Sequence, residues 1–143
     1  MKDFEWDDFL DEAPETPEIS VKIIRRAVAG GGTEFGYLDQ HGDFIRHLED
    51  GPAFTSFDGT KYWFINGVLH REDGPAAIYP TGTKEWIING LYHRLDGPAI
   101  IHLDGTGIWY FNDIIHRTGG PAIICSDGKQ EWWINGVLQE NPK

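Results

Sequence analysis

The chain has 143 residues, about the length of one domain, and is rich in aromatic residues, with six Trp, five Tyr and eight Phe. Its one cysteine, Cys125, excludes an intrachain disulfide and a cysteine-rich metal cluster. The sequence shows no signal-peptide core and no apolar run of about 18 residues. We therefore expect no membrane span, no cofactor and a cytoplasmic location, in the host cytoplasm if the source is a virus.

The negative charge is concentrated at one end of the chain. Residues 1–18 hold eight acidic residues against one lysine, so they carry −7 of the net charge of −11 and leave −4 for the other 125 residues. Phosphates would be repelled by this charge, which disfavours direct binding to nucleic acid. A protein partner with a basic or apolar groove is favoured instead.

Residues 1–18 are predicted to be an acidic tail that is disordered in isolation. Within "DFEWDDFLDE" (3–12), the side chains of Trp6, Phe9 and Leu10 have the spacing of one helical face, so a partner's groove would fold them into a short helix. The candidate partner-binding residues of the tail are Phe4, Trp6, Asp7, Asp8, Phe9 and Leu10. A solubilising tail and a tail that docks on its own repeat sheet remain open alternatives.

Residues 19–46 are expected to form an N-terminal cap region, atypical because it has no Trp in the register of the repeats. Its beginning, "ISVKIIRRAVAGGG" (19–32), is ambiguous. Ile19, Val21 and Ile23 alternate as in a strand, whereas residues 24–28 fit a helix that ends at Gly30. The strand is the slightly favoured alternative.

Residues 47–143 contain a repeat of 23 residues, without an insertion. The triplet Gly-Pro-Ala begins at Gly51, Gly74, Gly97 and Gly120. The same step separates the members of the Trp, Asn and His columns: Trp63, Trp86, Trp109 and Trp132; Asn66, Asn89, Asn112 and Asn135; His47, His70, His93 and His116. A register shared by four columns indicates a repeat array. Its last unit has Gln139-Glu140 in place of His-Arg, as expected of a polar C-terminal cap.

Each repeat is predicted to contain short antiparallel strands joined by two recurring turns. Asp-Gly (as at Asp104-Gly105) and Asn-Gly (as at Asn89-Gly90) both suit two-residue type I′ hairpin turns, because these residues tolerate positive φ. The prolines lack an N–H and therefore mark the beginning of a strand or a bulge. The fold class that we predict is all-β: an elongated, twisted antiparallel β-meander of about four two-stranded repeats with atypical caps.

The motif "W-x-x-N-G-x-x-H" (63–70 and 86–93) and the 23-residue period resemble a divergent MORN repeat. The continuation His-Arg-x-Asp-Gly-Pro-Ala replaces the usual His-Gly-x-Gly and is similar to repeats in uncharacterised bacteriophage, bacterial and large-virus proteins. The resemblance covers about two thirds of the chain. MORN arrays are generally non-catalytic scaffolds that bind proteins, so it implies a binding module and names no substrate.

The repeated polar columns are better explained by structure than by catalysis. Equivalent positions two strands apart lie roughly 9–10 Å from each other, too far for His70, His93 and His116 to share a zinc ion. We assign the His column a structural role, packing beside the next Trp and bonding the turn that follows. The Arg column (Arg71, Arg94 and Arg117) and the Asp column (Asp50, Asp73 and Asp96) favour local ion pairs over a basic ladder for acidic partners. We expect no catalytic residues and no metal ligands.

Strand alternation divides the aromatic residues between two faces. The structural repeat residues Trp63, Trp86, Trp109 and Trp132 share one face, and the candidate partner-binding residues Phe64, Tyr110 and Trp133 share the other. A single-layer sheet hides both faces only if it curls, is covered by the N-terminal segment or pairs with another molecule, such as a second copy in a homodimer.

These features favour a non-enzymatic protein–protein interaction module that binds through the aromatic sheet face and the acidic tail. The resemblance makes a phage-type inhibitor of a host or defence protein the most specific form of this hypothesis. One alternative is an acidic DNA mimic in a nucleic-acid-binding cleft, although most of the charge lies in the tail. An enzyme that uses the repeated His and Asp residues is the last alternative, because every candidate residue is repeated.

Overall fold

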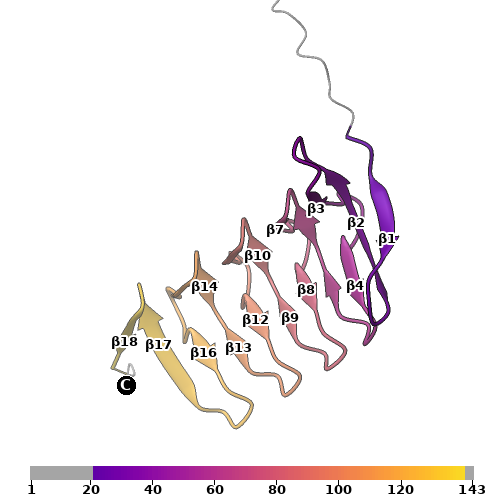
Figure 1. The fold of residues 1–143 in the computed structure, drawn as a ribbon. Helices are drawn as coiled ribbons and strands as arrows, with labels where there is room; N and C mark the ends of the chain where they lie inside the picture. Colours follow the sequence, from indigo (N-terminus) through magenta and orange to yellow (C-terminus); the bar gives the residue numbers. More distant parts are fainter. Residues whose placement is uncertain (1–20, 141–143) are drawn as a thin grey trace, which may run out of the picture.

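The computed structural model of the protein describes residues 21–140 and confirms the all-β meander. These residues form antiparallel strands and no helix. Figure 1 shows an elongated ladder of strands, with the N-terminal cap at one end and the last repeat at the other. The tail residues Phe4, Trp6, Asp7, Asp8, Phe9 and Leu10 lie outside the described part of the chain.

A twelve-stranded main sheet runs the length of the ladder, in the order β1-β2-β4-β5-β8-β9-β12-β13-β16-β17-β18, with β3 also paired to β2. Its strands are β1 (Ile24–Ala27), β2 (Gly32–Leu38), β3 (Phe44–Arg46), β4 (Phe54–Ser56), β5 (Lys61–Tyr62), β8 (Ala77–Ile78), β9 (Lys84–Glu85), β12 (Ile100–Ile101), β13 (Gly107–Ile108), β16 (Ile123–Ile124), β17 (Gln130–Ile134) and β18 (Val137–Gln139). Since β1 pairs with β2, the described part of residues 19–32 contains a strand and no helix. The strand begins at Ile24, after the alternating residues Val21 and Ile23 that favoured it.

Three two-stranded hairpins lie along one side of the main sheet (Figure 1). They are β6–β7 (Phe64–Ile65 and Val68–Leu69), β10–β11 (Ile87–Ile88 and Leu91–Tyr92) and β14–β15 (Tyr110–Phe111 and Ile114–Ile115). The strands of the main sheet and of the hairpins are separated at Trp63, Trp86 and Trp109, whereas β17 continues through Trp132. Each complete repeat therefore contains a pair of strands in the main sheet and a small hairpin beside it.

The Asn-Gly turns have the predicted geometry and the Asp-Gly turns do not. Asn89 and Gly90 both have positive φ, 51° and 80°, as type I′ requires. Of Asp104 and Gly105 only the glycine has positive φ, and the backbone N–H of His102 donates to Thr106, which encloses a three-residue loop. The carboxylate of Asp104 accepts the N–H of Thr106 at 2.8 Å. Such side-chain capping stabilises a turn in which Asp keeps negative φ, so the type I′ prediction was wrong here.

The core of the ladder is thin. Five alanines, four of them from the Gly-Pro-Ala triplets, are 0% exposed: Ala53, Ala76, Ala77, Ala99 and Ala122. Ile87 and Ile100 are also buried, but none of the large side chains in residues 21–140 is fully buried. A single-layer sheet with this core depends on contacts between neighbouring repeats, because within residues 21–140 no second layer removes its faces from water.

Candidate functional site

The face that carries the Trp column is built from repeated pairs of side chains. The Arg71 guanidinium lies over the Trp63 ring, with its central carbon 4.3 Å from the ring centroid, and the same distance is 4.0 Å for Arg94 on Trp86 and 4.1 Å for Arg117 on Trp109. Such stacking is a cation–π interaction, for which Trp is the best ring. We call these three pairs the Trp–Arg rungs.

Each guanidinium in the rungs is also held by hydrogen bonds. Arg71 Nε donates to Asp73 at 2.7 Å and Arg94 Nε to Asp96 at 2.9 Å, which confirms the predicted local ion pairs. Nη1 of all three arginines donates to the carbonyl of the following proline, at 3.3, 3.2 and 2.9 Å. In the third rung Gly119 replaces the aspartate, and the stack persists without it.

The rungs explain the glycine of the Gly-Pro-Ala triplet. A Cβ atom built on Gly74, Gly97 or Gly120 would lie 2.9, 2.8 or 3.0 Å from the guanidinium carbon of its own rung. A side chain there would require the guanidinium to shift from its present position on the Trp ring, and glycine leaves room for it. The alanine that ends the triplet is completely buried, so Gly-Pro-Ala contributes to the packing of the array.

The His column connects each repeat to the next. The Nδ1 atoms of His47, His70 and His116 accept the backbone N–H of Asn66, Asn89 and Asn135, each at 3.1 Å. His93 Nδ1 lies 2.7 Å from Oδ1 of Asn112. The His93 ring also packs against the ring of Phe111 in the next repeat, with 4.8 Å between the two ring centroids. The predicted structural role of His70, His93 and His116 is thus seen as contacts with the Asn turn of the following repeat.

The opposite face of the array carries the predicted residues Phe64, Tyr110 and Trp133, on β6, β14 and β17. All three are half-buried. Neighbouring rings are in contact: Tyr62 with Phe64 at 6.3 Å between centroids, and Tyr92 with Tyr110 at 5.3 Å. We call the surface formed by Phe54, Tyr62, Phe64, Tyr79, Tyr92, Tyr110 and Trp133 the aromatic face.

Two carboxylates lie within the aromatic face. Glu85 accepts hydrogen bonds from the hydroxyls of Tyr79 and Tyr92, both at 3.3 Å, and Glu131 accepts one from Trp133 Nε1 at 3.0 Å. Burial, and after it the charge of Glu85, raises the pKa of Tyr92 above its ordinary value. Hydrogen bonds from Lys129 and Trp133 lower the pKa of Glu131. Both glutamates are therefore hydrogen-bond acceptors beside aromatic rings.

The repeat columns did not identify Tyr62, Tyr79, Glu85 and Tyr92. Their columns vary from repeat to repeat: Tyr62 and Glu85 share one column with Ile108 and Glu131, and Tyr79 shares another with Ser56, His102 and Cys125. These positions therefore differ between otherwise regular repeats. That variation is a signal in the sequence that would have found them.

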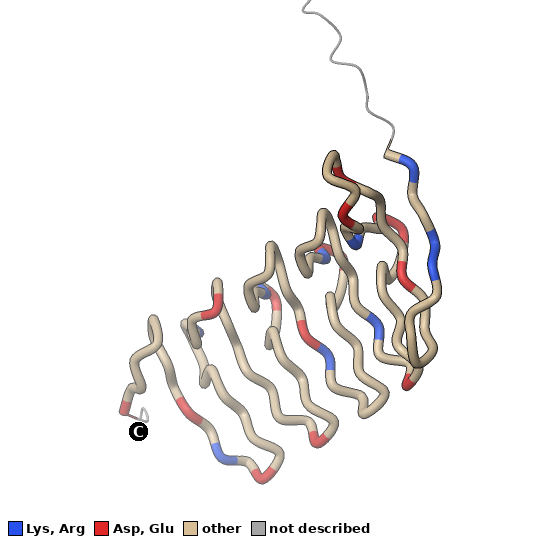
Figure 2. Tube along the Cα trace, in the orientation of Figure 1, with Lys and Arg blue, Asp and Glu red and all other residues tan. Residues whose placement is uncertain are grey.

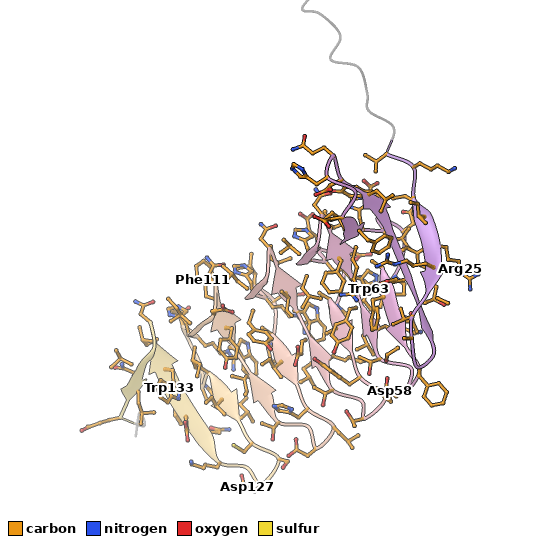
Figure 3. All side chains as sticks on the ribbon, in the orientation of Figure 1. Arg25, Asp58, Trp63, Phe111, Asp127 and Trp133 are labelled. Carbon is orange, nitrogen blue, oxygen red and sulfur yellow. The ribbon has the colours of Figure 1, made fainter. Side chains whose placement is uncertain are left out.

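The two kinds of turn lie on opposite long edges of the array. Asp58 and Asp127 lie on one edge in Figure 3, at the three-residue loops, and Phe111 lies on the other, beside the Asn turns.

Figure 2 shows acidic and basic residues interspersed along the described chain, without a continuous band of either sign. Within residues 21–140, no group of three or more His, Cys, Asp or Glu side chains is arranged to hold a metal ion.

Comparisons of the chain with protein-family models, with curated proteins and with solved structures gave no match. In residues 21–140 no helix has the length and apolarity needed to cross a membrane.

Proposed function

We propose that the protein is a non-enzymatic protein-binding module in which a MORN-like array binds a polypeptide through the aromatic face, with the acidic tail as a second contact. The observation that carries this proposal is the aromatic face itself, whose Tyr, Phe and Trp side chains are half-buried in a single-layer sheet. In its most specific form, the module inhibits a host or defence protein, as the resemblance to phage repeats suggests.

The composition of the aromatic face supports protein binding. Tyr and Trp are enriched among the residues that dominate binding energy, because they bring a large contact area with few rotatable bonds. Glu85 and Glu131 add charged acceptors that are already held by neighbouring hydroxyl and indole groups. A partner that presents apolar side chains with a few basic ones fits this surface.

The repeated polar residues support a non-catalytic role. Arg71, Arg94 and Arg117 are engaged by Trp rings and proline carbonyls, and the histidines bind the Asn turns. Side chains committed to packing in several equivalent repeats do not form the unique acid–base pair that catalysis requires. The interspersed charges of the described residues also differ from the continuous acidic surface expected of a DNA mimic (Figure 2).

Site-specific photo-crosslinking tests the proposal. A benzoylphenylalanine residue is placed at Tyr110 or Trp133 on the aromatic face. As a control it is placed at Leu103, an apolar residue that is 74% exposed and lies in the three-residue loop between His102 and Thr106. Both aromatic-face positions should crosslink to the same polypeptide in cells, and the Leu103 position should not. With that polypeptide purified, Tyr110→Ala should weaken binding at least about tenfold, whereas Leu103→Ala should not.

Crosslinking that is as strong from Leu103 as from the aromatic face would contradict the proposal. So would unchanged affinity of a folded Tyr110→Ala variant. The melting temperature of each variant is measured first, so that loss of binding is separated from loss of folding.

A further inference from the structure

The last repeat departs from the Trp–Arg rungs at one position. Arg71, Arg94 and Arg117 each follow their Trp by the same interval, and at that interval after Trp132 the chain has Glu140. Within residues 21–140, no lysine or arginine lies over the Trp132 ring, although the three preceding rings are covered. Among the described residues, the last Trp therefore lacks the cation that completes its equivalents.

A cavity of about 360 Å³ marks this difference. It is lined by the Trp132 ring together with Ile134, Gln139 and Glu140, and its other wall is formed by Arg117, Gly119 and Gly120 of the preceding repeat. The equivalent cavities beside Trp86 and Trp109 contain Arg94 and Arg117 among their lining residues. Each internal cavity thus has the arginine of the preceding rung and that of its own rung, whereas the last cavity has Arg117 of the preceding rung and Glu140 in place of its own arginine.

We propose that this cavity binds an arginine side chain supplied by a partner protein. The internal rungs are the template for the ligand: a guanidinium stacks on the Trp ring and donates to a carboxylate, as Arg71 does with Trp63 and Asp73. The planar guanidinium fits both contacts better than a lysine ammonium, because it stacks flat while its edge donates hydrogen bonds. Glu140 supplies the carboxylate that the internal arginines find in Asp73 and Asp96.

Arg117 lines this cavity, but other contacts already hold its side chain. Its guanidinium is engaged by Trp109 and by the carbonyl of Pro121 at 2.9 Å. A guanidinium on Trp132 would lie one repeat further along, which is the interval that the array already accommodates between Arg71, Arg94 and Arg117. Trp132 and Trp133 are consecutive in β17 and point to opposite faces, so this site is separate from the aromatic face and does not rest on the proposed function.

Nuclear magnetic resonance of the six indole N–H groups tests the proposal directly. The full-length protein is titrated with N-acetyl-arginine methylamide, and the Trp132 signal is assigned with Trp132→Phe. This signal should shift saturably, with a dissociation constant of millimolar order for a single side chain, while the signals of Trp63, Trp86 and Trp109 stay in place. N-acetyl-citrulline methylamide, which has the same shape without the charge, should produce no saturable shift.

Three variants sharpen the result. Glu140→Gln should weaken arginine binding about two- to fivefold, since it removes an exposed ion pair. Glu140→Arg restores the side chain of the internal rungs and should abolish binding, because the protein's own guanidinium then covers Trp132. Trp133→Phe, on the opposite face, is the matched control and should leave the affinity unchanged.

Absence of a saturable Trp132 shift would overturn the proposal, and so would an equal response to citrulline or undiminished binding by Glu140→Arg. Lys143 is the one cationic residue that follows Trp132 in the sequence. If arginine binds only after Lys143→Gln, the chain's own lysine occupies the site, and a cation supplied by a partner is excluded.

Discussion

The N-terminal cap and the internal repeats both combine an arginine, an aromatic ring and a carboxylate, but they bury different members of the set. In the cap, Arg26 lies over Phe44 at 3.5 Å and Arg46 over Phe54 at 4.7 Å, and both donate to Glu34, which is only 5% exposed. In the internal repeats, the carboxylates of Asp73 and Asp96 are more than 80% exposed.

This difference shows which contact holds the arginines in each region. Glu34 on β2 binds arginines from β1 and β3, so a buried carboxylate joins three strands of the cap. In the internal repeats the ring and the proline carbonyl hold the arginine, and the third rung dispenses with the aspartate altogether. We infer that the carboxylate is essential to the cap and accessory to the repeats.

The largest effect is expected for a ring in the middle of the array. Trp86→Ala should destabilise the protein by about 3 kcal/mol, the lower end for large aromatic deletions because Trp86 is half-buried. Trp132→Ala should cost less, since no arginine of the described residues stacks on it. Urea denaturation of the two variants measures the difference. Equal effects, or none at Trp86, would show that stacking does not stabilise the internal rungs.

In the cap, Glu34→Gln should destabilise by about 2 kcal/mol at neutral pH, because charge-assisted hydrogen bonds to two arginines are lost. Burial opposes ionisation of Glu34, but hydrogen bonds from Arg26 and Arg46 outweigh it and lower its pKa below 4.5. Its contribution is therefore present above that ordinary value and is lost as the pH falls through the lowered pKa. Melting temperatures of the two proteins should converge in acid, and a constant gap would contradict this account.

A smaller effect is expected for a link between repeats. His70→Gln removes the Nδ1 acceptor of the Asn89 N–H, which should cost about 1 kcal/mol or less because the turn is exposed and water replaces the bond. Hydrogen exchange of the Asn89 amide should accelerate, while that of Asn135, bonded to His116, should not. Unchanged protection of Asn89 would mean that the histidine does not hold the turn.

The smallest effect is expected for the exposed carboxylate of an internal rung. The hydrogen bond from Arg94, and then its charge, lowers the pKa of Asp96, but exposed pairs are screened by solvent. Asp96→Asn should leave the melting temperature nearly unchanged at neutral pH, in low or high salt. A large decrease in the melting temperature would mean that the carboxylate, and not the ring, is the main contact that stabilises the rung.

Much of the fold could be predicted because its determinants are local. The 23-residue register, the type I′ Asn-Gly turns and the Arg–Asp pairs depend on residues close in the chain, and the structure agrees with them. The geometry of the Asp-Gly turns was mispredicted, because the aspartate side chain caps the loop and permits a longer one. Strand alternation identified Phe64, Tyr110 and Trp133 of the aromatic face but not Phe54, Tyr62, Tyr79, Glu85 and Tyr92.

The sequence by itself determined the repeat, the strand pairing and the two faces, because turn residues and side-chain alternation act over a few residues. Only the tertiary structure decided that the glycine of each triplet makes room for an arginine, and that a histidine binds a turn 19 residues further on. It also separated Glu34, which joins the cap, from Asp96, which lies at the surface. The physical reason is that burial and contacts between repeats depend on how neighbouring strands stack, and no single repeat contains that information.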